Sequence, residues 1–85
     1  MIVPELTAEE SEAARAETQR NLDLVEKRLT LAWGRRLTLS QQDLVSKIRG
    51  FTDGAKEAIR ASDWERGRTL SKKALVLAEQ LAAGL

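Results

Sequence analysis

Three helix-start signals divide this sequence, and they constrain its fold more than any other feature. The signals are residues 7–10 (TAEE), 40–43 (SQQD) and 62–65 (SDWE). In each, a Ser or Thr hydroxyl can accept a hydrogen bond from the backbone amide three residues later, and the acidic side chain can reach back to the capping residue. An apolar pattern with a spacing of three to four residues follows each signal, as in helices with one buried face.

These signals predict an all-α protein with helices at about residues 8–33, 41–61 and 63–83, after an extended lead at residues 1–6. The chain holds many Leu and Ala residues but only one Phe and two Trp, and this composition favours helices over strands. Short connections force consecutive helices to run antiparallel. We therefore expect residues 1–85 to form a single domain, a three-helix up-down-up bundle.

The first predicted helix changes character along its length. Its apolar stripe begins only after Thr18, and Gly34 follows the stripe as a stop signal. The members of the stripe are Leu22, Val25, Leu29, Ala32 and Trp33. Before Thr18 the apolar side chains are alanines, which support a helix but bury little surface. We expect the first two turns to be weakly held or to project past the other helices.

The second and third helices are expected to pack closely. Gly50 and Gly54 lie one turn apart inside the second helix and continue to Ala58, which makes a ridge of small residues. Because a Gly inside a helix costs about 1 kcal/mol relative to Ala, close helix approach along this ridge is the expected reason for both. Leu39 and Leu44 flank the second start signal and are placed for a hydrophobic staple.

Residues 51–78 resemble a tetratricopeptide-type helical hairpin. The residues that carry the resemblance are an early large residue, small residues at the crossing, a turn and a second-helix stripe: Phe51; Gly54, Ala55 and Ala58; Ser62, Asp63 and Trp64; Gly67, Ser71, Ala74 and Leu75. The chain departs from the motif because Ser71 stands where a large aromatic is expected, no Pro follows Ala78, and no second copy is present. The resemblance implies a helical hairpin with a role in protein–protein contact, and the first helix would cover the face that a neighbouring repeat normally covers.

The residue types present exclude several kinds of chemistry. Without Cys or His, the chain lacks the usual zinc ligands and the commonest general base. Adjacent residues such as Ser71 and Lys72 point about 100° apart on a helix, so they do not form a nucleophile–base pair. Gly50 and Gly54 lie inside a helix and do not form a phosphate-binding loop. We therefore expect no enzymatic activity, no cofactor and no small-molecule substrate.

Charge and hydropathy limit the partners. The net charge of +1 gives no general attraction to nucleic acid, although residues 21–85 hold twelve basic and eight acidic residues. The basic residues form two groups: Lys27, Arg28, Arg35 and Arg36 near the first loop, and Arg66, Arg68, Lys72 and Lys73 on the last helix. No apolar run approaches the roughly 20 residues of a membrane span. The compartment stays open between the cytoplasm and, for a mature fragment, the periplasm.

The candidate partner-contact residues surround the first loop: Leu24, Leu31, Trp33, Arg35 and Arg36. Trp is enriched at interaction hot spots. Its apolar neighbours near this loop, Leu31, Leu37 and Leu39, make up more apolar surface than three helices are expected to cover. The sequence therefore predicts a non-catalytic helical module for protein–protein interaction or self-association. Two alternatives remain: a polyanion or nucleic-acid binder that uses the basic face, and a helical C-terminal fragment of a larger, exported bacterial protein.

Overall fold

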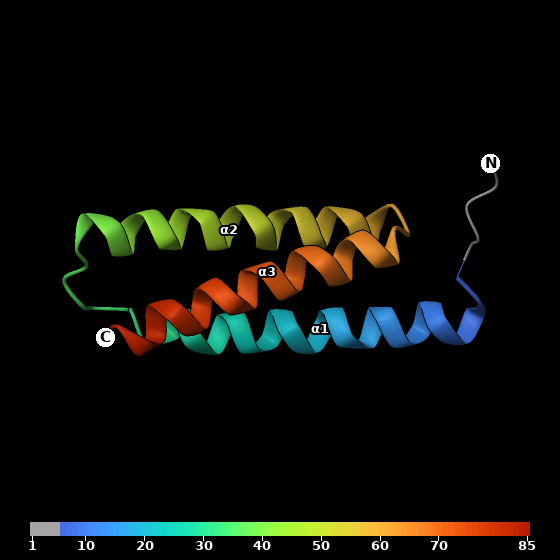
Figure 1. Cartoon of the computed structure of the whole chain (residues 1–85), viewed down its shortest axis with the longest axis horizontal. Coiled ribbons are helices and arrows are strands. Elements are labelled where there is room, and N and C mark those ends of the chain that lie inside the picture. The colour runs from blue at the N-terminus through green and yellow to red at the C-terminus, as the bar shows by residue number, and fades with distance from the viewer. Residues whose placement is uncertain (1–5) are drawn as a thin grey trace.

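The computed structural model describes residues 6–85, which form three helices and, within that range, no strand. The helices are α1 (Ala8–Thr30), α2 (Leu39–Arg60) and α3 (Trp64–Ala83). They run up, down and up along an elongated molecule of 48 × 22 × 19 Å (Figure 1). The predicted all-α three-helix bundle is confirmed. The predicted extended lead falls outside the described residues except at Leu6, which belongs to no helix.

The start of α1 is capped as the sequence predicts. Thr7 Oγ1 accepts a hydrogen bond of 3.1 Å from the Glu10 amide, and the Thr7 amide donates one of 3.3 Å to Glu10 Oε1. Two backbone donors that would otherwise lack a partner at the helix end are satisfied by this exchange.

The start of α2 lies two residues earlier than predicted. Thr38, not Ser40, is the capping residue: its Oγ1 accepts from the Gln41 amide at 3.1 Å, and its amide donates to Gln41 Oε1 at 2.9 Å. Leu37 now precedes the cap and packs against the core, whereas Leu39 is 84% exposed. The predicted staple of Leu39 on Leu44 is therefore wrong, because the earlier start turns Leu39 toward solvent.

The start of α3 also differs by one residue. Ser62 has a φ of 59°, and Asp63 caps the helix by accepting a hydrogen bond of 3.3 Å from the Arg66 amide. The left-handed Ser62 closes α2: its amide donates to the Ile59 carbonyl and the Asp63 amide to the Ala58 carbonyl, a Schellman arrangement. The predicted cap of Ser62 with Glu65 is wrong because Ser62 is already used to end α2.

The end of α1 tightens before the chain turns. The helix ends at Thr30 rather than near Trp33, and the amides of Leu31, Ala32 and Trp33 each donate to a carbonyl three residues back, at 3.0–3.2 Å. Hydrogen bonds of this span wind the chain more tightly than an α-helix. Gly34, with a φ of 77°, then redirects the chain toward α2, as its position in the sequence predicts.

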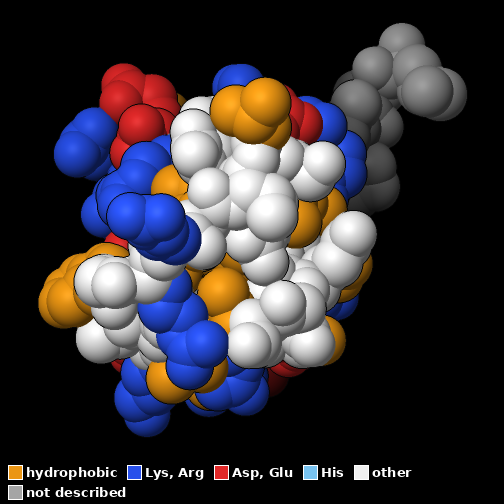
Figure 2. Space-filling model, turned by 90° about the vertical axis from the view of Figure 1, so that its left-hand side faces the viewer, with side chains coloured by type: hydrophobic (Ala, Val, Ile, Leu, Met, Phe, Trp, Pro, Cys, Tyr) orange, Lys and Arg blue, Asp and Glu red, His pale blue; other side chains and the backbone are white. Residues whose placement is uncertain are grey.

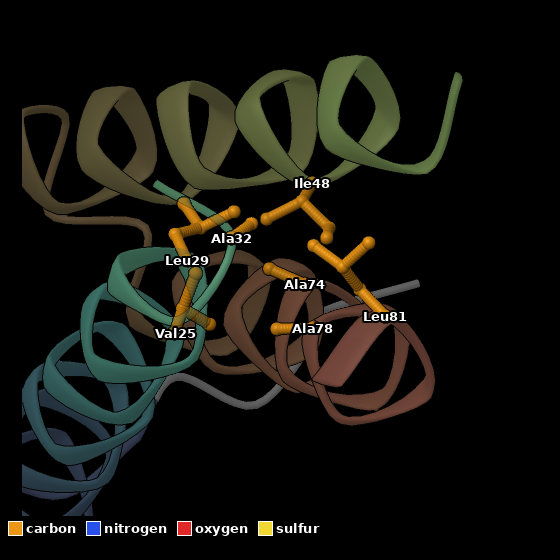
Figure 3. Packing of buried hydrophobic residues seen from close by; sticks show 7 residues of the cluster. All are labelled: Val25, Leu29, Ala32, Ile48, Ala74, Ala78 and Leu81. Atoms are coloured by element: carbon orange, nitrogen blue, oxygen red, sulfur yellow. The ribbon is translucent and has the colours of Figure 1, made fainter. Parts of the chain in front are cut away.

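Helix α3 lies between α1 and α2 and packs against both, while α1 and α2 touch each other little (Figure 1). The buried cluster fills the half of the molecule where α1 ends, α2 begins and α3 ends (Figure 3). Its members are Val25, Leu29, Ala32, Ile48, Ala74, Ala78 and Leu81. Burial of these apolar side chains is the main stabilising contribution to the fold.

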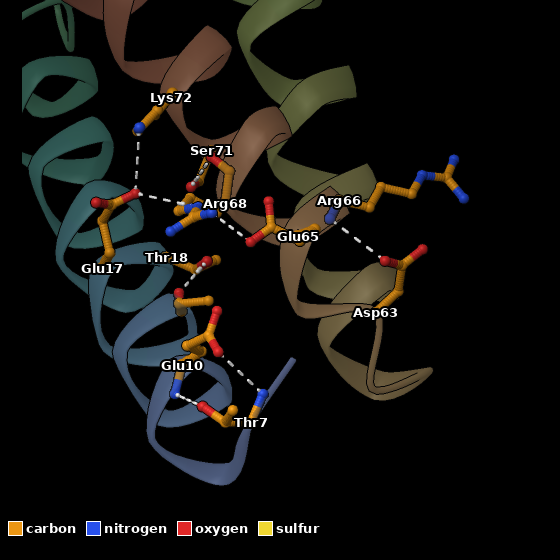
Figure 4. A network of polar contacts seen from close by, with 11 residues as sticks. Thr7, Glu10, Glu17, Thr18, Asp63, Glu65, Arg66, Arg68, Ser71 and Lys72 are labelled. Carbon is orange, nitrogen blue, oxygen red and sulfur yellow. Dashed lines mark hydrogen bonds and ion pairs between the residues drawn. The ribbon is translucent and has the colours of Figure 1, made fainter. Parts of the chain in front are cut away.

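Polar contacts replace large apolar ones toward the other end of α1 (Figure 4). The buried Asn21 donates from Nδ2 to Ser71 Oγ at 3.2 Å, and Thr18 donates to the Ala14 carbonyl at 2.7 Å. Glu17 lies 3.5 Å from Lys72 of α3. Beyond these contacts the first turns of α1 project past the turn that joins α2 and α3, as the sequence predicts (Figure 1).

The ridge of small residues holds only in part. A Cβ atom on Gly54 would lie 3.0 Å from Leu70 Cδ1, so α2 and α3 approach closely there. A Cβ on Gly50 would meet nothing within 4 Å, and the predicted close approach is wrong at this position. The physical reason is the diagonal course of α3, which is nearest to α2 toward the turn that joins them (Figure 1).

Candidate functional site

The connection between α1 and α2 exposes more large apolar surface than any other segment from residue 6 onward. Trp33 is 67% exposed, Leu31 is 52% exposed, and Leu39 lies at the start of α2. Arg35 and Arg36 occupy the same connection and are exposed. We call these five residues the loop-end surface.

The tight turn after Thr30 explains the exposure of Trp33. Ala32 takes the buried position that continues the stripe of α1 into the core (Figure 3). The next residue, Trp33, is exposed. The indole borders an open hollow of about 180 Å³ between α1 and α2. The other residues that line the hollow are Leu29, Ala32, Leu37, Val45 and Arg49.

Basic side chains surround this apolar surface. Figure 2 looks onto this end of the molecule and shows Lys and Arg side chains spread between hydrophobic and uncharged surface, with Asp and Glu at the margins. Arg35 donates from Nη1 to the Leu85 carbonyl at 3.1 Å, which ties the connection to the end of the chain. Arg36 forms no ion pair among residues 6–85. The loop-end surface is therefore both apolar and positively charged.

The structure gathers four of the five predicted contact residues. Leu31, Trp33, Arg35 and Arg36 lie within one short connection. Leu24 is half-buried on α1, seven residues before Leu31, which is about 10 Å along a helix axis, so it lies outside the loop-end surface.

Leu39 is not among the five predicted contact residues, because its position beside Ser40 favoured a covered staple residue. It is, however, one of the apolar residues near the first loop that three helices were expected to cover poorly. The signal that could have found it is Thr38 followed three residues later by Gln41, an equally complete capping pattern two residues earlier.

A second hollow lies between α2 and α3. It has a volume of about 300 Å³ and is lined by Phe51, Lys72, Lys73, Val76 and Leu77. Lys73 Nζ lies 5.8 Å from the centre of the Phe51 ring, within the range of a cation–π interaction. Val76 is exposed here and is not among the predicted contact residues.

A third hollow lies at the opposite end of the molecule from the loop-end surface. It has a volume of about 350 Å³, and we call it the projection-end hollow. Its lining combines residues before and in α1 with the turn that joins α2 to α3: Leu6, Ser11, Ser62, Asp63, Trp64 and Glu65. Trp64 is half-buried, so it closes this end of the bundle only in part.

The charged side chains of the described residues form ion pairs within single helices and also between helices, where Glu17 of α1 lies near Arg68 and Lys72 of α3. Glu65 accepts a hydrogen bond from Arg68 and thereby raises the pKa of this guanidinium above its usual value, so Arg68 stays charged (Figure 4). Among residues 6–85, acidic side chains nowhere gather in threes that could hold a metal ion. Over the same range, no helix is long and apolar enough to cross a membrane.

Comparison with known proteins identified no relative of this chain. No protein-family model, curated protein or solved structure matches the chain.

Proposed function

We propose that this protein is a non-catalytic helical module that contacts a protein partner through the loop-end surface. The observation that carries the proposal is the exposure of Trp33 beside Leu31 at one end of the bundle, next to the buried Ala32. Trp is enriched among the few residues that dominate the binding energy of protein interfaces. The flanking Arg35 and Arg36 suit the charged rim of such an interface.

The energetics of burying this surface support the same proposal. A fully exposed aromatic side chain that becomes covered removes about 150–250 Å² from water, so Trp33, which is 67% exposed, can remove roughly 100–170 Å². At about 25 cal/mol per Å² this gives roughly 2.5–4 kcal/mol before the costs of association. Leu31 and Leu39 would add apolar surface around the indole. A partner that covers all three residues would therefore gain a substantial binding energy from a small contact.

The basic side chains around Trp33 favour a second candidate, a polyanion or single-stranded nucleic acid. Arg35 and Arg36 can contact phosphates, and an exposed indole can stack on a base. Binding of this kind weakens steeply as salt rises, because each phosphate contact releases counterions. Contact with an apolar protein surface depends less on salt, and this difference separates the two candidates.

Site-specific photo-cross-linking in the cell that makes the protein tests the proposal. We expect Trp33→p-benzoylphenylalanine to give discrete protein adducts, and Arg20→p-benzoylphenylalanine, an exposed control at mid-length of α1 and far from both ends of the molecule, to give none of them. An adduct that disappears after nuclease digestion would support the nucleic-acid candidate instead. The same adducts from both positions, or none from position 33, would overturn the proposal.

A further inference from the structure

The two ends of this molecule differ in shape. At the loop end the large aromatic side chain is that of Trp33, which is 67% exposed. At the other end the projection-end hollow opens between the start of α1 and the turn before α3. Most of its lining is polar, and the half-buried Leu6 and Trp64 add a smaller apolar part that an inserted ring can contact.

The two ends also differ in the sign of their charge. Lys27 and Arg28 lie in the last turn of α1, and Arg35 and Arg36 follow in the connection. At the projecting end, acidic residues outnumber basic ones. The exposed acidic residues are Glu9, Glu10 and Glu12 of α1, and Asp63 and Glu65 beside the hollow, whereas the exposed basic ones are Arg15, Arg66 and Arg60, the last paired with Glu57. Glu9, Glu12 and Asp63 form no ion pair among residues 6–85.

A contact between these ends can form only between two molecules. The helices run the length of a particle 48 Å long, and the two ends lie at its opposite extremes (Figure 1). Trp33 is therefore far from the hollow of its own chain. A second copy can present its acidic hollow to the basic, aromatic end of the first copy. It can equally present its own basic, aromatic end to the acidic hollow of the first copy.

We propose that this chain associates with itself, and that Trp33 of one copy enters the projection-end hollow of the next. Arg35 and Arg36 then face Glu9 and Glu12 of the second copy, where opposite charges guide the approach and fix its orientation. This inference rests on the proposed interaction function and names the partner as a second copy. Because the two surfaces differ, the contact is heterologous and continues along a row of molecules unless the rotation between copies closes a ring.

Charge reversal tests the pairing. One variant carries Glu9→Lys and Glu12→Lys and leaves the capping Glu10 intact, and the other carries Arg35→Glu and Arg36→Glu. The mass in solution is measured by light scattering over a concentration series at low salt. We expect the native chain to exceed the monomer mass as its concentration rises, each variant alone to associate at least about ten-fold more weakly, and an equimolar mixture to regain the association, since each contact again joins opposite charges.

The controls separate this pairing from general effects of charge. Arg20→Glu with Lys73→Glu changes the net charge as much as the second variant does, but both residues lie at mid-length and are exposed, so association should persist. Circular dichroism checks that every variant is helical. We expect added salt to weaken the native association, because it screens the facing charges. Trp33→Ala should weaken association even at high salt, because it removes the inserted ring.

Two results would overturn the inference: a native chain that stays monomeric at every concentration, or an equimolar mixture of the reversed variants that stays as weakly associated as each variant alone. If the native chain is monomeric while position 33 still cross-links to other proteins, self-association is overturned and the proposed function stands. If position 33 gives no adduct and the native chain is monomeric, both are overturned.

Discussion

Thr38 decides where α2 begins and, with it, which leucine of the connection is covered. Its two hydrogen bonds with Gln41 place Leu37 before the cap, against the core, and Leu39 inside the first turn, in solvent. Ser40 is also a good capping residue by type, but it lies within the helix, where its hydroxyl is exposed. Leu39 therefore belongs to the loop-end surface because Thr38, and not Ser40, caps α2.

The choice of cap leads to a prediction at the scale of single residues. Thr38→Ala removes the hydroxyl that accepts from Gln41 and should lower the free energy of unfolding by about 1 kcal/mol. Ser40→Ala should change it by no more than a few tenths, because Ser40 caps nothing. Urea unfolding followed by circular dichroism measures both variants. A larger loss for Ser40→Ala than for Thr38→Ala would contradict the assigned cap.

At the scale of elements, α2 meets α3 closely only along part of its length. The two glycines of α2 lie one turn apart, yet only Gly54 faces Leu70, while Gly50 faces solvent. The difference arises because α3 crosses α2 at an angle, so equivalent positions one turn apart have different neighbours. The two glycines of α2 therefore have different explanations. Gly54 allows α3 to pack closely, whereas Gly50 lies where no neighbouring helix requires a particular side chain.

The two glycines form a matched pair for testing this packing. Gly50→Ala should stabilise the protein by about 1 kcal/mol, the difference in helix propensity, because its Cβ meets nothing. Gly54→Ala gains the same propensity, but Leu70 must move to admit a Cβ at 3.0 Å, so the net change should be clearly smaller or destabilising. Thermal or urea unfolding gives both values. Equal stabilisation by the two substitutions would show that α2 and α3 are not tightly packed at Gly54.

At the scale of the whole molecule, the two outer helices depend on α3. Helix α3 supplies Ala74, Ala78 and Leu81 to the core, and its Ser71 accepts the hydrogen bond from Asn21 of α1. The free energy of unfolding of a chain of this size is about 5 kcal/mol. The free energy of local opening lies below this value and differs between segments of the chain. The projecting turns of α1 have the fewest neighbours, and the middle of α3 has the most.

Amide hydrogen exchange measured by NMR tests this distribution. We expect the amides around Ala74 and Ala78 to exchange slowest, at rates that approach global unfolding, because they are buried between two helices. The amides of the first turns of α1, up to about Glu12, should exchange fastest among the helical ones, because the surrounding side chains are exposed. Equal protection along all of α1 would show that its start is held by contacts absent from this structure.

The sequence determines by itself those features that depend on neighbours along the chain. Helix type, number and antiparallel order follow from the capping signals, the spacing of apolar residues and the short connections, and the Thr7 cap is found as predicted. The projecting start of α1 follows from its alanines, which offer little to pack. These features depend on residues three or four positions apart, and this is the range that a sequence pattern describes.

Only the tertiary structure decides between local signals of similar strength. Thr38 and Ser40 are both suitable caps, and Ser62 can either cap α3 or end α2. These choices turn on which leucine reaches the core and on how the chain must turn between α2 and α3, and both involve residues distant in sequence. The exposure of Trp33 has the same origin. Its spacing places it on the buried stripe of α1, but the tightened turn lets Ala32 fill the core position and leaves the indole outside.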